Sequence, residues 1–242
     1  MEIIYEDNHL IAVNKSSSEL VQGDKTGDKS LVEILKSHLK REYNKPGNVF
    51  LGVVHRLDRP VSGVVLFAKT SKALTRMNRL FREQEVQKKY WAIVKTPPVP
   101  SQGELNHHLV RNQKQNKSYA YDKPVVNSKS AKLAYRLIAS SKDFHLLEIE
   151  LFTGRHHQIR CQLAKINCPV RGDLKYGYPR SNKDGGIDLH AREIRFIHPV
   201  KTEAIEVMAK PPGHKLWNYF LDRINDRRLF PEQETPIENE GE

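Results

Sequence analysis

The sequence is poor in cysteine and has no long hydrophobic run. Cys161 and Cys168, the two cysteines among 242 residues, are too few and too close together for a disulfide framework or a zinc site. No apolar stretch is long enough to span a bilayer, and residues 1–7 lack the basic and then apolar pattern of a signal peptide. These absences argue against a disulfide-stabilised secreted domain and a membrane helix, and they predict a cytoplasmic protein.

The sequence also has few acidic residues relative to basic ones. It contains 29 Asp and Glu against 40 Lys and Arg, which gives a net charge of +11. Residues 231–242 hold five glutamates and no basic residue, so the basic excess lies in the rest of the chain. Such an excess favours a polyanionic partner, most commonly nucleic acid, and no basic amphipathic helix points to a membrane surface. We expect one folded domain over residues 1–229 and a disordered acidic tail over 230–242.

Apolar patterning predicts an α+β domain in which strands predominate and helices are interspersed. Residues 101–130 are polar and predict a long surface excursion with RNA contact as its expected role. Helix caps are expected at Ser30 and at Thr70 or Ser71. The expected strands span residues 3–5, 10–13, 49–54, 64–68, 88–95, 132–138, 145–152 and 193–197, and the expected helices span about 30–39, 71–82, 155–167 and 214–223.

The loop between the apolar runs 49–54 and 64–68 carries the most informative residues. Asp58 lies between Arg56 and Arg59, and nearby positive charges keep a carboxylate ionised at neutral pH. Asp58 is therefore either a structural acid in a salt bridge or a reactive nucleophile or base.

Five blocks of sequence follow one another along the chain. They are His-Arg-Leu-Asp at 55–58 with Ser-Gly at 62–63, Lys-x-Tyr at 88–90, Gly-Arg-x-His-Gln-Ile-Arg at 154–160, the turn at 172–177, and 189–191 through 198–199. In these blocks the chain resembles the catalytic domain of the RluA-type family of RNA pseudouridine synthases, from about residue 3 to about residue 210. It departs from the family at Val61, where a threonine is usual, and at 15–18, where Lys-Ser-Ser-Ser replaces Lys-Pro-x-Gly. We expect no S4-like domain before the catalytic region.

The resemblance implies a pseudouridine synthase fold, with a mixed, mostly antiparallel sheet, flanking helices and a central active-site cleft. It also implies a cofactor-free isomerisation of uridine to pseudouridine in structured RNA, either ribosomal or transfer RNA. The resemblance implies that Asp58 is either a nucleophile, which attacks the sugar or the uracil, or a general base, which abstracts a proton. Arg155, with Arg160 as second choice, is implied as the cation that holds Asp58 ionised, and Tyr90 as the ring against the target base. The competing interpretations are an exposed arginine at a helix start for Arg155 and an ordinary core tyrosine for Tyr90.

Other residues of these blocks are expected to bind substrate. Arg56 is expected to fill the space of the flipped uridine or to hold a phosphate, with a structural salt bridge as its alternative. The remaining expected substrate-binding residues are His55, His157, Arg160 and Lys88.

No metal is expected, because His55 and Asp58 lack a third ligand at recognisable spacing and the adjacent histidine pairs would not share a helix face. RNA is the expected partner, without a membrane or an obligate protein partner, and the protein is expected to be a monomer. The alternative function is a catalytically idle, basic RNA-binding protein. A metal-dependent phosphodiesterase built on His55 and Asp58 is a more distant alternative.

Overall fold

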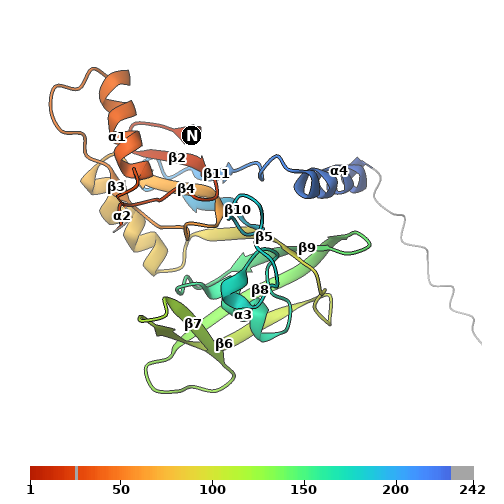
Figure 1. Ribbon diagram of the computed structural model, residues 1–242. Coiled ribbons are helices and arrows are strands. Elements are labelled where there is room, and N and C mark those ends of the chain that lie inside the picture. Colours follow the sequence, from red (N-terminus) through yellow and green to blue (C-terminus); the bar gives the residue numbers. More distant parts are fainter. Residues whose placement is uncertain (25–26, 230–242) are drawn as a thin grey trace, which may run out of the picture.

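The computed structural model describes residues 1–24 and 27–229 (Figure 1). The predicted acidic tail at 230–242 lies outside the described residues. None of the described helices is long and apolar enough to cross a membrane. The strands are β1 (Glu2–Glu6), β2 (Leu10–Lys15), β3 (Gly52–Val53), β4 (Ser62–Ala68), β5 (Gln87–Val94), β6 (Gln102–Asn112), β7 (Lys117–Tyr121), β8 (Lys129–Ser140), β9 (His145–Leu151), β10 (Leu189–Ile197) and β11 (Ala204–Met208). The helices are α1 (Leu31–Glu42), α2 (Ser71–Arg82), α3 (Gln158–Lys165), the 3₁₀ turn η1 (Leu174–Tyr176) and α4 (Lys215–Leu229).

The strands form one sheet in the order β1-β2-β4-β10-β5-β9-β8-β6-β7, with β11 beside β10 and β3 beside β4. Every described pairing is antiparallel except that of β4 with β10. The prediction of a mixed, mostly antiparallel sheet in an α+β fold is confirmed.

The parallel pairing of β4 with β10 depends on Gly63. Its φ is +117°, and a Cβ atom there would lie 2.2 Å from the carbonyl oxygen of Ala191. Only glycine permits this backbone conformation together with so close an approach. The pairing joins the end of the Asp58 loop to the centre of the sheet.

Helices cover both faces of the sheet around β5. Tyr90 and Ala92 belong to the core cluster that includes Ile159 of α3, whereas Trp91 and Ile93 pack with residues of α4. Successive strand residues point to opposite faces, so α3 and α4 lie on opposite sides of β5 (Figure 1).

The helix caps follow local chemistry. Ser30 and Glu33 form a capping box at the start of α1, and Thr70 accepts a hydrogen bond from the Ala73 N–H at the start of α2. The predicted start of the third helix at residue 155 is wrong, because α3 begins at Gln158 after a left-handed residue, His157, with φ of +52°.

The prediction of an irregular excursion over residues 101–130 is also wrong. β6 and β7 pair with each other and β6 pairs with β8. Leu105, His107 and Leu109 are buried at alternate positions of β6, as in a strand with one face on the core. Polar residues on the outward face hide this alternation in the composition.

Candidate active site

The loop that carries Asp58 is anchored by a buried lysine. Lys15 Nζ donates to the carbonyl oxygens of Ser16, Arg59 and Val61 at 2.9, 3.0 and 2.7 Å. The Val61 N–H donates back to the Asp58 carbonyl, which closes a turn. Lys15 is 1% exposed, and this burial lowers its pKa to about 8. The loop therefore depends on a cation that three backbone carbonyls satisfy.

One carboxylate oxygen of Asp58 accepts a hydrogen bond from Arg160 and faces His157. Arg160 Nη1 lies 2.9 Å and His157 Nε2 lies 3.4 Å from Asp58 Oδ2. Among the described residues no hydrogen bond reaches Oδ1. Because the side chain is 29% exposed, Asp58 is a fixed and accessible carboxylate with one oxygen available to react.

Arg160 is itself fixed by a second acid. Its Nε and Nη2 donate to the two oxygens of Asp173 at 2.7 and 2.9 Å, and the Asp173 side chain is only 1% exposed. Burial opposes the Arg160 charge, but hydrogen bonds and charges from Asp173 and Asp58 hold its pKa above the usual arginine value. The planar guanidinium thus bridges two carboxylates, a geometry that a lysine ammonium does not reproduce.

A tyrosine orients His157 from behind. The Ser118 N–H donates to Tyr176 Oη at 2.8 Å, and Oη lies 3.0 Å from His157 Nδ1. Nδ1 is the hydrogen-bond partner that Tyr176 offers its own proton, and donation from Oη favours the tautomer with a proton on Nε2, the nitrogen that faces Asp58. Burial lowers the pKa of His157 to about 3, with Asp58 opposing the effect and the Arg160 charge adding to it. His157 is therefore a neutral ring 3.4 Å from the Asp58 carboxylate.

Beside Asp58 lies a small cavity of about 120 Å³, the size of a single planar ring. Tyr90 lines it and is 8% exposed. Burial, and then the charge of Asp58, raises the pKa of Tyr90, so the phenol is neutral at physiological pH. Arg56 and Arg155 line the same cavity and are exposed. The other lining residues are Leu57, Val61, Leu151, Gly154, His157, Gln158, Ile159, Arg160 and Leu189.

Most of the predicted site residues meet at this cavity, but the predicted ion pair was assigned to the wrong arginine. Asp58 pairs with Arg160, the second choice, whereas Arg155 Nε donates to the Ser130 carbonyl at 2.9 Å. The left-handed residue His157 ends the turn that carries Arg155 outward and starts the helix that carries Arg160 inward.

His55 and Lys88, both expected to bind substrate, do not line this cavity. His55 Nε2 accepts the Leu66 N–H at 3.1 Å, and its ring stacks on Phe81. Lys88 Nζ lies 5.7 Å from the centroid of the same Phe81 ring. Burial, followed by the Lys88 charge, lowers the pKa of His55 to about 4. Both residues support the fold behind the Asp58 loop.

The sequence analysis assigned no role to Lys15, Asp173 or Tyr176. The last two belong to the block 172–177, which was noted only for its glycines and its resemblance. An acid and a tyrosine inside a motif block were the available signal. Among the described residues no group of three or more His, Cys, Asp or Glu side chains is arranged to hold a metal ion.

Residues 9–165 match the family model described as RNA pseudouridylate synthase. Ribosomal large subunit pseudouridine synthase C of Rickettsia prowazekii is 34% identical over 92% of this chain and 70% of its own length. The synthase C of Vibrio cholerae is 32% identical over 88% of this chain and 66% of its own length.

Among solved structures, human RNA pseudouridylate synthase domain containing 4 has a TM-score of 0.75 at 24% identity, and 93% of each chain is covered. This likeness confirms the fold. The family model and the curated relatives establish that the chain belongs to the RNA pseudouridylate synthase family of isomerases, in the RluA type that its motifs resemble.

Proposed function

We propose that this protein isomerises uridine to pseudouridine in structured RNA with Asp58 as the nucleophile or base. The observation that carries the proposal is the Asp58 carboxylate, held through one oxygen by Arg160 and facing His157, beside a ring-sized cavity lined by Tyr90. The whole protein's target is part of this proposal, because the chain spans only 66–70% of the relatives compared above.

The reaction conserves all atoms. The C1′–N1 bond of uridine breaks, the uracil turns, and a C1′–C5 bond forms, while C5 loses a proton and N1 gains one. Asp58 Oδ1 is the oxygen available to attack or to accept a proton. Arg160 donates to the carboxylate before substrate binds, and a donor that is already oriented stabilises charge without further reorganisation.

Tyr90 is proposed to stack on the displaced uracil. Flipping a base out of RNA costs a few kcal/mol, and stacking on an aromatic ring returns roughly 1–3 kcal/mol per base. Arg56 and Arg155 are exposed at the same cavity and are suited to hold the flanking phosphates.

The proposed substrate class is ribosomal RNA. Two relatives carry the name ribosomal large subunit pseudouridine synthase, and the net charge of +11 suits a structured RNA. We also propose action in the cytoplasm as a monomer without a protein partner. The two free, buried thiols Cys161 and Cys168 suit a reducing compartment.

Tritium release from RNA labelled at C5 of uridine tests the proposal. The wild type is expected to release tritium, and Asp58→Asn to release none, because an amide is neither a nucleophile nor a base here. Glu42→Gln, the same change of carboxylate to amide at an exposed position of α1, is the matched control and should retain full release. RNA binding without release by the wild type would favour the idle RNA-binding alternative.

A further inference from the structure

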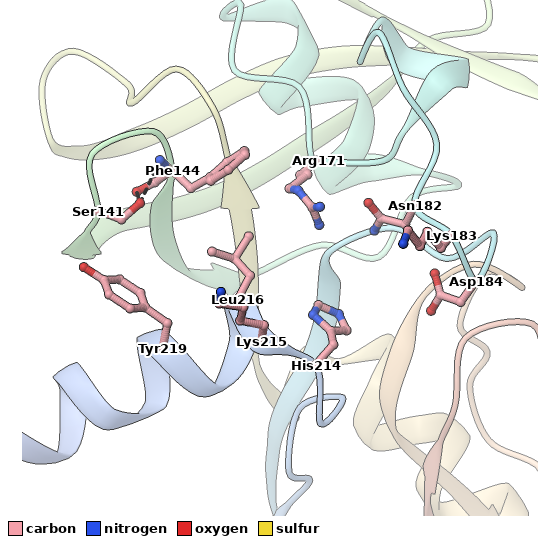
Figure 2. Close-up of a pocket in the computed structure, with 10 residues that line it drawn as sticks. All are labelled: Ser141, Phe144, Arg171, Asn182, Lys183, Asp184, His214, Lys215, Leu216 and Tyr219. Carbon is pink, nitrogen blue, oxygen red and sulfur yellow. Dashed lines mark hydrogen bonds between the residues drawn. The ribbon is translucent and has the colours of Figure 1, made fainter.

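A second and larger cavity lies where α4 packs against β5, and it shares no lining residue with the cavity beside Asp58. Its volume is about 600 Å³, against about 120 Å³ beside Asp58, and pockets for small ligands span roughly 300–1,000 Å³. The turn between β8 and β9, the segment after α3 and the first turns of α4 enclose it (Figure 2). It is large enough for a whole nucleotide.

The position of this cavity separates it from the site of the target uridine. Phe144 and Leu216 line it and pack against the cluster of Trp91 and Ile93. Tyr90, on the opposite face of β5, packs on the Asp58 side. A ligand in this cavity is therefore a group other than the base that reacts at Asp58.

One end of the cavity is apolar and aromatic. Figure 2 shows Phe144 and Tyr219 at this end, with the Leu216 side chain beside them. Tyr219 is 36% exposed, and the Arg223 guanidinium lies 5.2 Å from its ring centroid. Flat aromatic groups stack on such rings without base-specific hydrogen bonds.

The other end is polar and organised by one buried acid. The Asp188 side chain is 2% exposed and forms a salt bridge with Arg171. Asn182 Nδ2 donates to Asp188 Oδ1 at 3.0 Å, and His214 Nε2 lies 3.5 Å from the same oxygen. Three side chains of the cavity wall are thus held by a single carboxylate.

The charges leave room for one anionic group. Arg171 is paired with Asp188 behind the wall, and the wall itself carries two further cations, Lys183 and Lys215, against one carboxylate, Asp184. These five groups leave an excess of one positive charge. In the described part of the chain neither Lys183 nor Lys215 forms an ion pair. A phosphodiester carries one negative charge, which matches this excess.

We infer that this cavity binds one nucleotide of the RNA substrate other than the target uridine, with its base on Phe144 and Tyr219 and its phosphate on Lys183 and Lys215. Arg223 extends the basic surface along α4 beyond the cavity. An RNA chain that continues past the bound nucleotide needs such a surface for its next phosphates, whereas a free nucleotide does not. The inference rests on the proposed function, because it takes RNA as the ligand.

The test combines two variants with measurements of RNA affinity and turnover. Tyr219→Leu keeps an apolar side chain but removes the stacking ring, and Lys183→Glu reverses an exposed charge. Each is expected to weaken binding of the tritium-labelled RNA about fivefold or more, with the effect on KM rather than kcat. Tyr43→Leu and Lys40→Glu, equivalent changes at exposed positions in and after α1, are the controls. Circular dichroism checks that each variant is folded.

Photo-crosslinking identifies the occupant directly. RNA carrying 4-thiouridine at single positions is expected to crosslink to the peptides of Phe144 or Tyr219 from a nucleotide other than the target. Three outcomes would overturn the inference. The first is unchanged RNA affinity in both folded variants. The second is binding of free uridine monophosphate or adenosine monophosphate as tightly as RNA. The third is stronger competition against crosslink formation by an oligoglutamate peptide than by an oligonucleotide of equal charge.

These outcomes are separate from failure of the proposed function. If the wild type releases tritium and the variants match it in KM, only the nucleotide site is wrong. If no RNA releases tritium, the proposed function fails, and crosslinking still decides whether the cavity holds RNA.

Discussion

Replacing Arg160 should separate its contribution to stability from its contribution to catalysis. In Arg160→Met the apolar stem is kept, and the three hydrogen bonds to Asp58 and Asp173 are lost. The two acids differ in burial, since the Asp58 side chain is 29% exposed and that of Asp173 is 1% exposed. The loss of stability should therefore come mainly from Asp173, and the loss of rate from Asp58.

The magnitudes follow from these contacts. Leaving Asp173 charged and buried without its partner costs about 3–5 kcal/mol, a large part of a typical stability of about 5–15 kcal/mol. Adding Asp173→Asn removes the unpaired charge, so the residual cost should fall to about 1–2 kcal/mol. Losing the donor on Asp58 should slow the chemical step by roughly 100-fold in both variants, because neither restores it.

Two measurements check this separation. Urea unfolding gives the stability of wild type, Arg160→Met, Asp173→Asn and the double variant, and the cycle gives the coupling of the pair. Single-turnover tritium release at saturating RNA gives the rate of the chemical step. Arg155→Ala is the comparison, since Arg155 is exposed, donates to a backbone carbonyl and is proposed to hold a phosphate. It should weaken RNA binding, while its single-turnover rate at saturating RNA and its stability stay near the wild-type values.

The result that would refute this reasoning is the reverse pattern. If Arg155→Ala loses about 100-fold in rate while Arg160→Met keeps it, Arg155 is the cation that acts on Asp58. If the double variant is no more stable than Arg160→Met, the buried charge of Asp173 is not the cause of the instability.

Three further predictions concern residues around the site. Tyr176→Phe removes the hydroxyl that donates to His157 Nδ1, so the pKa of His157, measured by ¹⁵N NMR, should rise. The acid side of the pH–rate profile should move to higher pH with it, and an unchanged profile would argue against the tautomer assigned here. Lys15 should make the reaction rate fall above about pH 8, where its ammonium loses a proton. The neutral amine has two N–H groups, too few for the three carbonyls that it binds. Its folded pKa lies below the unfolded value, so its contribution to stability rises with pH above about 8, and the rate should fall without a loss of Tm from this group. Gly63→Ala should cost more than about 2 kcal/mol in thermal unfolding, whereas Gly154→Ala, with open space around its Cβ, should have little effect on stability.

Local chemistry explains what could be predicted from the sequence. The strand after Asp58, the caps of α1 and α2, and the blocks of the resemblance all depend on residues close together in the chain. The strand predicted over 49–54 is reduced to residues 52–53. The excursion over 101–130 was mispredicted because β6 alternates buried and outward residues in a segment whose overall composition is polar. Its pairing with β8 joins residues distant in the sequence, which no local period encodes.

The sequence by itself determined the family, the acid Asp58 and its neighbours in the motif blocks, because these are short strings of residue types. Only the tertiary structure decided that Arg160 and not Arg155 holds Asp58, 102 residues away along the chain. It also decided that Tyr176 orients His157, that His55 turns away from the cavity, and that α4 closes a second cavity. The physical reason is that a hydrogen bond depends on the position and direction of its two groups, and a single left-handed residue at His157 sets both for Arg155 and Arg160.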